Sequence, residues 1–132
     1  MSGRVDTFRG MTLTIWHNPR CSKSRRTLAL IEEAGIEPSV RLYLDDAPSV
    51  AELAEALELL GMEPWELARM GEPLAKETGL SELSRDGSTR DEWIRIMSAN
   101  PKLIERPVVI AGDGRARLGR PPESVGDLLP PA

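Results

Sequence analysis

A chain of 132 residues with one cysteine and a formal charge of −4 fits a single globular domain that needs neither disulfides nor a structural metal. One cysteine and one histidine are too few for a zinc site of the usual kind, and the acidic balance argues against nucleic acid as the main partner. No apolar run approaches the roughly 20 residues of a membrane span, and no secretory signal is present. We therefore expect a cytoplasmic protein with no metal, nucleic-acid or membrane partner.

The first half of the chain predicts a β-α-β unit. Residues 1–10 have no apolar periodicity, so we expect a disordered extension ahead of a single domain over residues 11–132. A β-prone run at residues 12–16 is followed by a helical pattern that ends at Ala34. Alternating apolar residues from Val40 to Leu44 predict a second strand, parallel to the first.

Helical signals then dominate residues 49–100, which we interpret as an insertion. Residues 49–52 have the sequence of a capping box, and Pro64 is placed to begin a second, short helix that carries Arg69. Ser88 is the predicted cap of a longer helix whose tryptophan and methionine side chains face the core.

The last part of the chain returns to strand. Two β-prone runs, residues 108–111 and 115–118, flank a Gly-Asp-Gly turn that is typical of a hairpin. A final helix follows, with Val125 and Leu128 on its apolar face. The order β-α-β, helical insertion, β-β-α predicts a thioredoxin-like α/β fold, in which helices flank a mixed sheet.

Cys21 lies at the predicted turn between the first strand and the first helix. The backbone N–H groups at a helix start have no partners and the helix dipole is positive there, so this place favours a thiolate and can hold an oxyanion. Four basic residues, Arg20, Lys23, Arg25 and Arg26, should lower the thiol pKa further. The alternative, a buried structural cysteine, fits poorly with such charged neighbours. The turn therefore indicates thiolate chemistry on a small tetrahedral anion.

Three motifs carry a resemblance to a known family: HNPRCSKSR at residues 17–25, RPVV at residues 106–109 and GRPPE at residues 119–123. With these motifs the chain resembles the glutaredoxin-coupled arsenate reductases over about residues 11–129. The resemblance implies a thioredoxin-like fold and reduction of arsenate to arsenite. It implies no bound cofactor, with glutathione as co-substrate and a glutaredoxin-like protein as partner.

The resemblance also implies roles for individual residues. Cys21 would be the nucleophile, with His17 and Arg106 as further catalytic residues. Pro107 would form the cis peptide bond that thioredoxin-like folds place opposite the catalytic thiol, and Asn18 and Pro19 would shape the site. The residues expected to bind the oxyanion are Arg69, Arg106, Arg120, Ser24 and Arg25.

Arginine suits oxyanion binding because its planar fork stays charged and donates two hydrogen bonds to one anion. A surface ion pair is the alternative role, with Glu105 or Glu123 as the acceptor for Arg106 or Arg120. For Arg69 the two roles are about equally supported. For His17, a purely structural hydrogen bond competes with tuning of the thiolate.

Other function classes fit less well. Cysteine phosphatases require an arginine six positions after the nucleophile, where this chain has Thr27. Thioredoxin-like regulatory modules usually carry Cys-x-x-Cys, whereas position 24 is serine here. A thiol reductase of the same family with a different substrate stays open, because arsenate, phosphate and related oxyanions are bound by the same donors.

Overall fold

The computed structural model of the protein describes residues 12–130, so the predicted extension at residues 1–10 lies outside the described residues. Contacts divide the chain into two compact units. One, here called the helical unit, is Tyr43–Glu105, and the predicted insertion at residues 49–100 falls inside it. The other, the sheet unit, contains residues 12–42 and 106–130.

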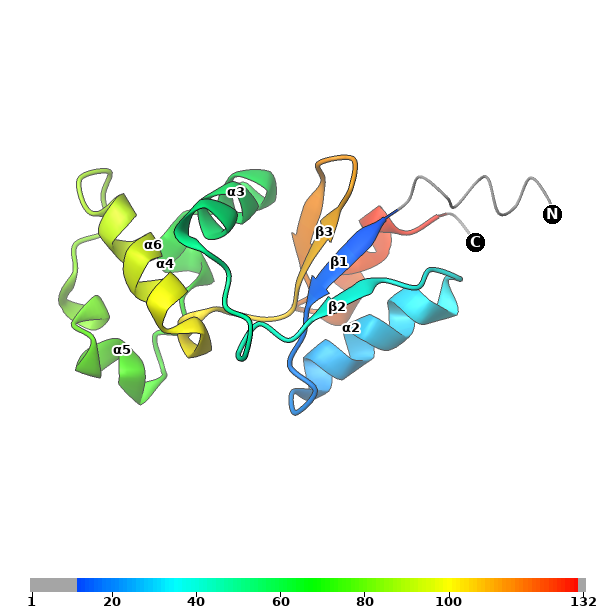
Figure 1. Ribbon diagram of the computed structural model, residues 1–132, viewed down its shortest axis with the longest axis horizontal. Helices are drawn as coiled ribbons and strands as arrows, with labels where there is room; N and C mark the ends of the chain where they lie inside the picture. The colour runs from blue at the N-terminus through cyan, green and yellow to red at the C-terminus, as the bar shows by residue number, and fades with distance from the viewer. Residues whose placement is uncertain (1–11, 131–132) are drawn as a thin grey trace. The chain divides into compact units, whose positions relative to one another are not determined.

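The sheet unit contains a four-stranded mixed sheet in the order β2-β1-β3-β4. β1 is parallel to β2 and antiparallel to β3, and β3 and β4 form the predicted hairpin (Figure 1). Gly114 has φ +95° in its turn, a conformation that glycine adopts without strain. The bounds are β1 (Leu13–Trp16), β2 (Ser39–Arg41), β3 (Val108–Ala111) and β4 (Ala116–Leu118). This architecture confirms the thioredoxin-like α/β fold.

One face of the sheet packs against helix α2 (Ser22–Glu33) and the 3-10 helix η3 (Pro122–Leu128). The C-terminal segment was predicted as an α-helix, and the structure corrects this to a 3-10 helix that still buries its apolar face. The buried core of the unit consists of Leu13, Ile15, Ile31, Ile36, Val109, Ala111, Val125 and Leu128. This packing fixes the start of α2 at the end of β1.

The prediction for the second strand is wrong at its end. β2 stops at Arg41, and the chain turns over the positions that had been expected to continue the strand. Val40 and Leu42 are 47% and 43% exposed, whereas Tyr43 is buried. The apolar alternation is real, but the strand is short and lies at the sheet edge, so these side chains face outward.

The helical unit contains four α-helices and two short 3-10 helices between residues 43 and 105. Ser49 and Glu52 form the predicted capping box, in which each side chain accepts the other residue's backbone N–H (3.1 and 2.9 Å). Trp93 and Met97 are buried as expected. The elements are α3 (Val50–Leu60), α4 (Pro64–Leu67), α5 (Pro73–Glu77), η1 (Leu80–Glu82), α6 (Arg90–Ala99) and η2 (Pro101–Leu103).

Two further predictions in the helical unit are wrong. The N-cap of α6 is Thr89, one residue later than predicted, and the hydroxyl of Ser88 donates instead to Oδ1 of Asp86 (2.5 Å). Arg69 is not on a helix, since α4 ends at Leu67. Arg69 follows a single β-bridge, and its N–H donates to the carbonyl of Leu103 (2.7 Å).

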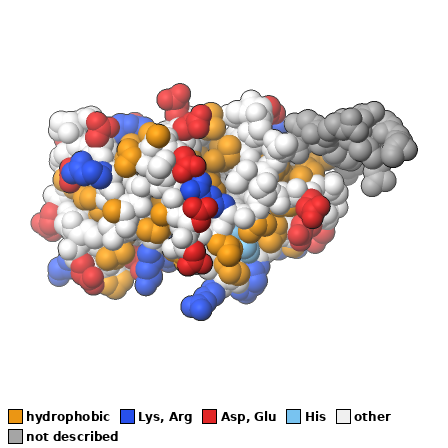
Figure 2. Space-filling view, in the orientation of Figure 1, with side chains coloured by type: hydrophobic (Ala, Val, Ile, Leu, Met, Phe, Trp, Pro, Cys, Tyr) orange, Lys and Arg blue, Asp and Glu red, His pale blue; other side chains and the backbone are white. Residues whose placement is uncertain are grey.

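The surface agrees with the charge balance of the sequence. On the face shown in Figure 2, acidic and basic side chains are intermixed rather than gathered by sign. No helix within residues 12–130 is both long enough and apolar enough to cross a membrane.

Candidate active site at the Cys21 turn

Cys21 occupies the N-cap position of α2, with extended backbone angles (φ −99°, ψ 123°). Its N–H donates to the carbonyl of Asn18 (3.0 Å), and its own carbonyl accepts the N–H of Arg25 (3.0 Å), which begins the helix. The thiol is partly exposed. The nucleophile candidate therefore lies at the predicted strand-to-helix turn, where a reagent in solution can reach it.

Opposing effects set the pKa of the Cys21 thiol. Partial burial has the largest single effect and raises the pKa, because a thiolate loses hydration there. Hydrogen bonds from the backbone N–H groups of Ser24 and Lys23 lower the pKa, as do the charge and a hydrogen bond of the Arg106 side chain. The lowering effects prevail together, so the pKa lies below its ordinary value. This shift gives Cys21 the thiolate character that a nucleophile requires.

The direction of this shift was predicted, but part of its cause was not. The largest effects that lower the pKa come from two backbone N–H groups and from the distant Arg106, and the basic side chains next to Cys21 in sequence are not among them. The Nη1 atom of Arg25 donates to the carbonyl of Pro19 (2.9 Å), and Arg26 lies 4.0 Å from Glu33. The main effect of Lys23 on the thiol comes from its backbone N–H.

The side chain of His17 contacts the Cys21 turn through Ser24. Its buried ring places Nδ1 2.7 Å from Oγ of Ser24, and that oxygen also accepts the N–H of Asn18 (3.0 Å). Burial lowers the pKa of His17, and the nearby charge of Arg25 lowers it further, so the imidazole is neutral at pH 7. The hydroxyl of Ser24 therefore stabilises the turn, and only its backbone N–H donates to the Cys21 thiol.

Arg106 and Arg120 come together at the end of the hairpin. Trp16 pairs with Val108, so the residues just before β3 lie beside the loop that follows β1. The Arg106–Pro107 peptide bond is cis, as predicted. Nη1 of Arg120 donates to the carbonyl of Arg106 (3.4 Å). The sheet unit thus brings Cys21, Arg106 and Arg120, three of the predicted site residues, into one region.

Arg69 belongs to the helical unit and makes ion pairs there. Its Nη2 lies 3.2 Å from Oε2 of Glu72, and its Nε lies 3.7 Å from Oε1 of Glu105. The ion-pair role that the sequence left open for Arg69 is therefore present in the structure. A part for Arg69 in oxyanion binding stays a prediction.

Comparison with known proteins agrees with this site. The ArsC family model matches residues 16–128, a span that includes the Cys21 turn, both hairpin strands and Arg120. The chain belongs to the ArsC family.

Several ArsC-family relatives are similar over nearly their full length. The arsenate reductase of Haemophilus influenzae is 42% identical over 120 residues, which cover 90% of this chain and 100% of that protein. The protein of Escherichia coli K12 named uncharacterized protein YfgD is 48% identical over 116 residues, 87% of this chain and 94% of its own. The solved structure of an arsenate reductase from Vibrio cholerae has 46% identity and a TM-score of 0.82, and the match covers 91% of this chain and 99% of that one.

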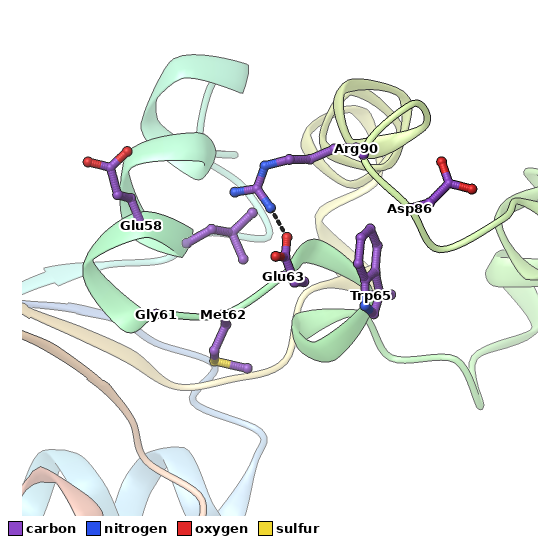
Figure 3. A pocket seen from close by; sticks show the side chains of 9 residues that line it. Glu58, Gly61, Met62, Glu63, Trp65, Asp86 and Arg90 are labelled. Carbon is purple, nitrogen blue, oxygen red and sulfur yellow. Dashed lines mark hydrogen bonds and ion pairs between the residues drawn. The ribbon is translucent and has the colours of Figure 1, made fainter.

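This ArsC-family chain also has a pocket in its helical unit, with a volume of about 460 Å³ (Figure 3). Trp65 and Met62 line it, and the guanidinium of its Arg90 is already paired with Glu63. The pocket has no nucleophilic thiol. Within residues 12–130, no three His, Cys, Asp or Glu side chains are grouped to hold a metal. The Cys21 turn is therefore kept as the candidate active site.

Proposed function

We propose that this protein is an arsenate reductase in which Cys21 is the nucleophile and external thiols supply the electrons. One observation carries the proposal: a partly exposed thiol with a lowered pKa accepts a hydrogen bond from Arg106 at the start of a helix. A thiolate beside a fixed cationic donor suits attack on a bound oxyanion. The arsenate reductases among its ArsC relatives support arsenate as that oxyanion.

In the first step, the sulfur of Cys21 attacks the arsenic of arsenate bound by Arg106 and Arg120. A sulfur–arsenic bond forms and an arsenic–oxygen bond breaks, and the oxygen leaves as water after it takes up protons. The guanidinium groups offset the negative charge on the remaining oxygens. Arsenic stays in its +5 state through this step.

In the second step, glutathione attacks the adduct. Two sulfur atoms, one from Cys21 and one from glutathione, give up two electrons and end as a mixed disulfide, while arsenic is reduced to +3 and leaves as arsenite. A glutaredoxin-like protein then reduces the disulfide by thiol exchange and restores the Cys21 thiolate.

The need for external thiols follows from the composition of the chain. Cys21 is its only cysteine, and Ser24 occupies the position where a Cys-x-x-Cys protein has its resolving thiol. A hydroxyl forms no disulfide. Over a complete cycle Cys21 returns to its starting thiolate, so both electrons that reduce arsenate must finally come from thiols of other molecules. This favours glutathione with glutaredoxin over thioredoxin alone.

The proposal is tested by measuring arsenite release from purified protein with two reducing systems. We expect turnover with glutathione and glutaredoxin, and almost none with thioredoxin and its reductase. Cys21→Ser is the matched control and should be inactive although folded. Sustained turnover on thioredoxin alone would exclude the single-thiol scheme, and arsenite release by Cys21→Ser would exclude Cys21 as the nucleophile.

A further inference from the structure

Gly119 lies where three parts of the sheet unit meet. It directly follows β4, and its N–H donates to the carbonyl of Pro107 (2.8 Å), which extends the β3–β4 pairing by one residue. The next residue is Arg120, whose Nη1 reaches the carbonyl of Arg106. The backbone at Gly119 thus determines how closely Arg120 approaches Arg106.

There is no room for a side chain at Gly119. A Cβ atom there would lie 2.6 Å from Oγ1 and 3.1 Å from Cγ2 of Thr27, and 2.8 Å from Cγ of Pro107. These distances are well inside normal contact between heavy atoms. The restriction is one of space and not of backbone conformation, because the φ of Gly119 is outside the positive range that favours glycine.

The neighbours of Gly119 cannot easily move. Thr27 is fully buried in α2, is stiff at χ1 because it is β-branched, and donates its hydroxyl to the carbonyl of Lys23 (2.8 Å). Pro107 is a closed ring joined to Arg106. A methyl group at position 119 would therefore displace the segment that carries Arg120, by about 1 Å if ordinary contact distances are to be restored.

We infer that Gly119 is a positioning residue: the absence of its side chain allows the chain to lie against Thr27 and Pro107, and this contact sets the place of Arg120 in the oxyanion site. The inference rests on the proposed function for the role of Arg120, but not for the geometry. A displacement of about 1 Å at a binding group can lower kcat/KM by about 10²-fold.

The test is a set of variants around the contact. Gly119→Ala should lower kcat/KM for arsenate by about 10²-fold. Adding Thr27→Ala removes two of the three close contacts and should recover most of that loss, measured against Thr27→Ala alone. Thr27→Val is the matched control, because valine keeps the shape of threonine, so it should not rescue. In an Arg120→Ala background, Gly119→Ala should cost little more.

Crystal structures of the wild type and Gly119→Ala supply a readout that needs no activity. We expect Arg120 to have moved away from the carbonyl of Arg106, and this arm decides the inference even if the wild type reduces no arsenate. If Gly119→Ala alone does not fold, Gly119→Ala/Thr27→Ala should fold, with Arg120 close to its place in Thr27→Ala, and Gly119→Ala/Thr27→Val should not fold. An unmoved Arg120 in a folded Gly119→Ala, equal rescue by Thr27→Val, or additive losses with Arg120→Ala would each overturn the inference.

Discussion

The side chain of Arg106 donates a hydrogen bond to the sulfur of Cys21, and its charge lowers the pKa of the thiol. The two residues come from opposite ends of the chain and meet because β1 and β3 are paired, with Trp16 opposite Val108. The loop after β1 and the residues before β3 are therefore side by side. Two sequence motifs form one site through the register of the sheet.

This contact predicts which arginine controls the reactivity of Cys21. The alkylation rate of wild-type protein against pH should give a thiol pKa below the usual value of about 8.5. Arg106→Ala should raise that pKa. Arg25→Ala should leave it nearly unchanged, because the Arg25 side chain donates to the carbonyl of Pro19 and not to the sulfur. If Arg25→Ala changed the thiol pKa more than Arg106→Ala, the cations next to Cys21 in sequence would be the ones that activate it.

Loss of either arginine of the hairpin region should impair catalysis. Arg106→Ala or Arg120→Ala should each cost about 2–4 kcal/mol of transition-state stabilisation, which lowers kcat/KM for arsenate by about 10²–10³-fold. Lysine should restore only part of this, because it lacks the planar fork. The control is Arg117→Ala, since Arg117 is on β4 but pairs with Asp127 (3.3 Å). Near wild-type kcat/KM in both alanine variants would refute the assignment.

Arg69→Ala, measured in the same assay, decides between the two roles of Arg69. If Arg69 binds the oxyanion, its loss should lower kcat/KM as far as the loss of Arg120 does. If it only pairs with Glu72 and Glu105, the effect should be on stability alone and small, because partly exposed ion pairs contribute little.

The elements that were predicted correctly are those whose sequence signal lies in a few adjacent residues. The hairpin turn at Gly114 and the capping box at Ser49 were predicted correctly, because each depends on a few adjacent residues. The end of β2 was predicted wrongly, because alternation at Val40 and Leu42 does not reveal whether the apolar side faces the core or the solvent. The cap of α6 was predicted one residue too early, because the hydroxyl of Ser88 bonds to the neighbouring Asp86 side chain and not to the start of the helix.

The same distinction holds at the site. Cys21 at a helix start could be identified from sequence, because strand and helix patterns meet there. Which charge acts on the sulfur could not, because the direction of each side chain on the first turn depends on how α2 packs, and the approach of Arg106 depends on strand pairing. The close contact at Gly119 likewise involves α2, β4 and Pro107 at once and has no signal in any one segment.

His17 should make the stability of the protein depend on pH. Burial, with the charge of Arg25, lowers the pKa of His17 in the folded state, so the unfolded chain binds the proton more readily. Above the ordinary pKa of about 6.5 the residue is neutral in both states and has no effect. As the pH falls below that value toward the lowered pKa, stability is lost. Urea unfolding at pH 7.5 and pH 5.5 should show a smaller loss for His17→Gln, and equal losses would contradict this role.

Ser24 should be important for stability as well as for the thiol. Its buried hydroxyl is the partner of both the His17 ring and the N–H of Asn18, so Ser24→Ala leaves one buried and one partly buried polar group unsatisfied. Such a loss costs about 1–3 kcal/mol. Thermal unfolding should show the decrease in Ser24→Ala and little change in Ser88→Ala, where the serine is exposed. A decrease confined to Ser88→Ala would be the opposite of what these contacts predict.

The central claim, that Cys21 forms a covalent intermediate which only an external thiol resolves, is tested most directly by intact-mass measurement of the stalled enzyme. Protein is incubated with arsenate and glutathione, glutaredoxin is left out, and the mass is compared with that of Cys21→Ser. We predict an added glutathione mass, with or without arsenic, on the wild type alone, and its loss when glutaredoxin is added. The absence of any adduct while arsenite accumulates, or the same adduct on Cys21→Ser, would contradict the claim.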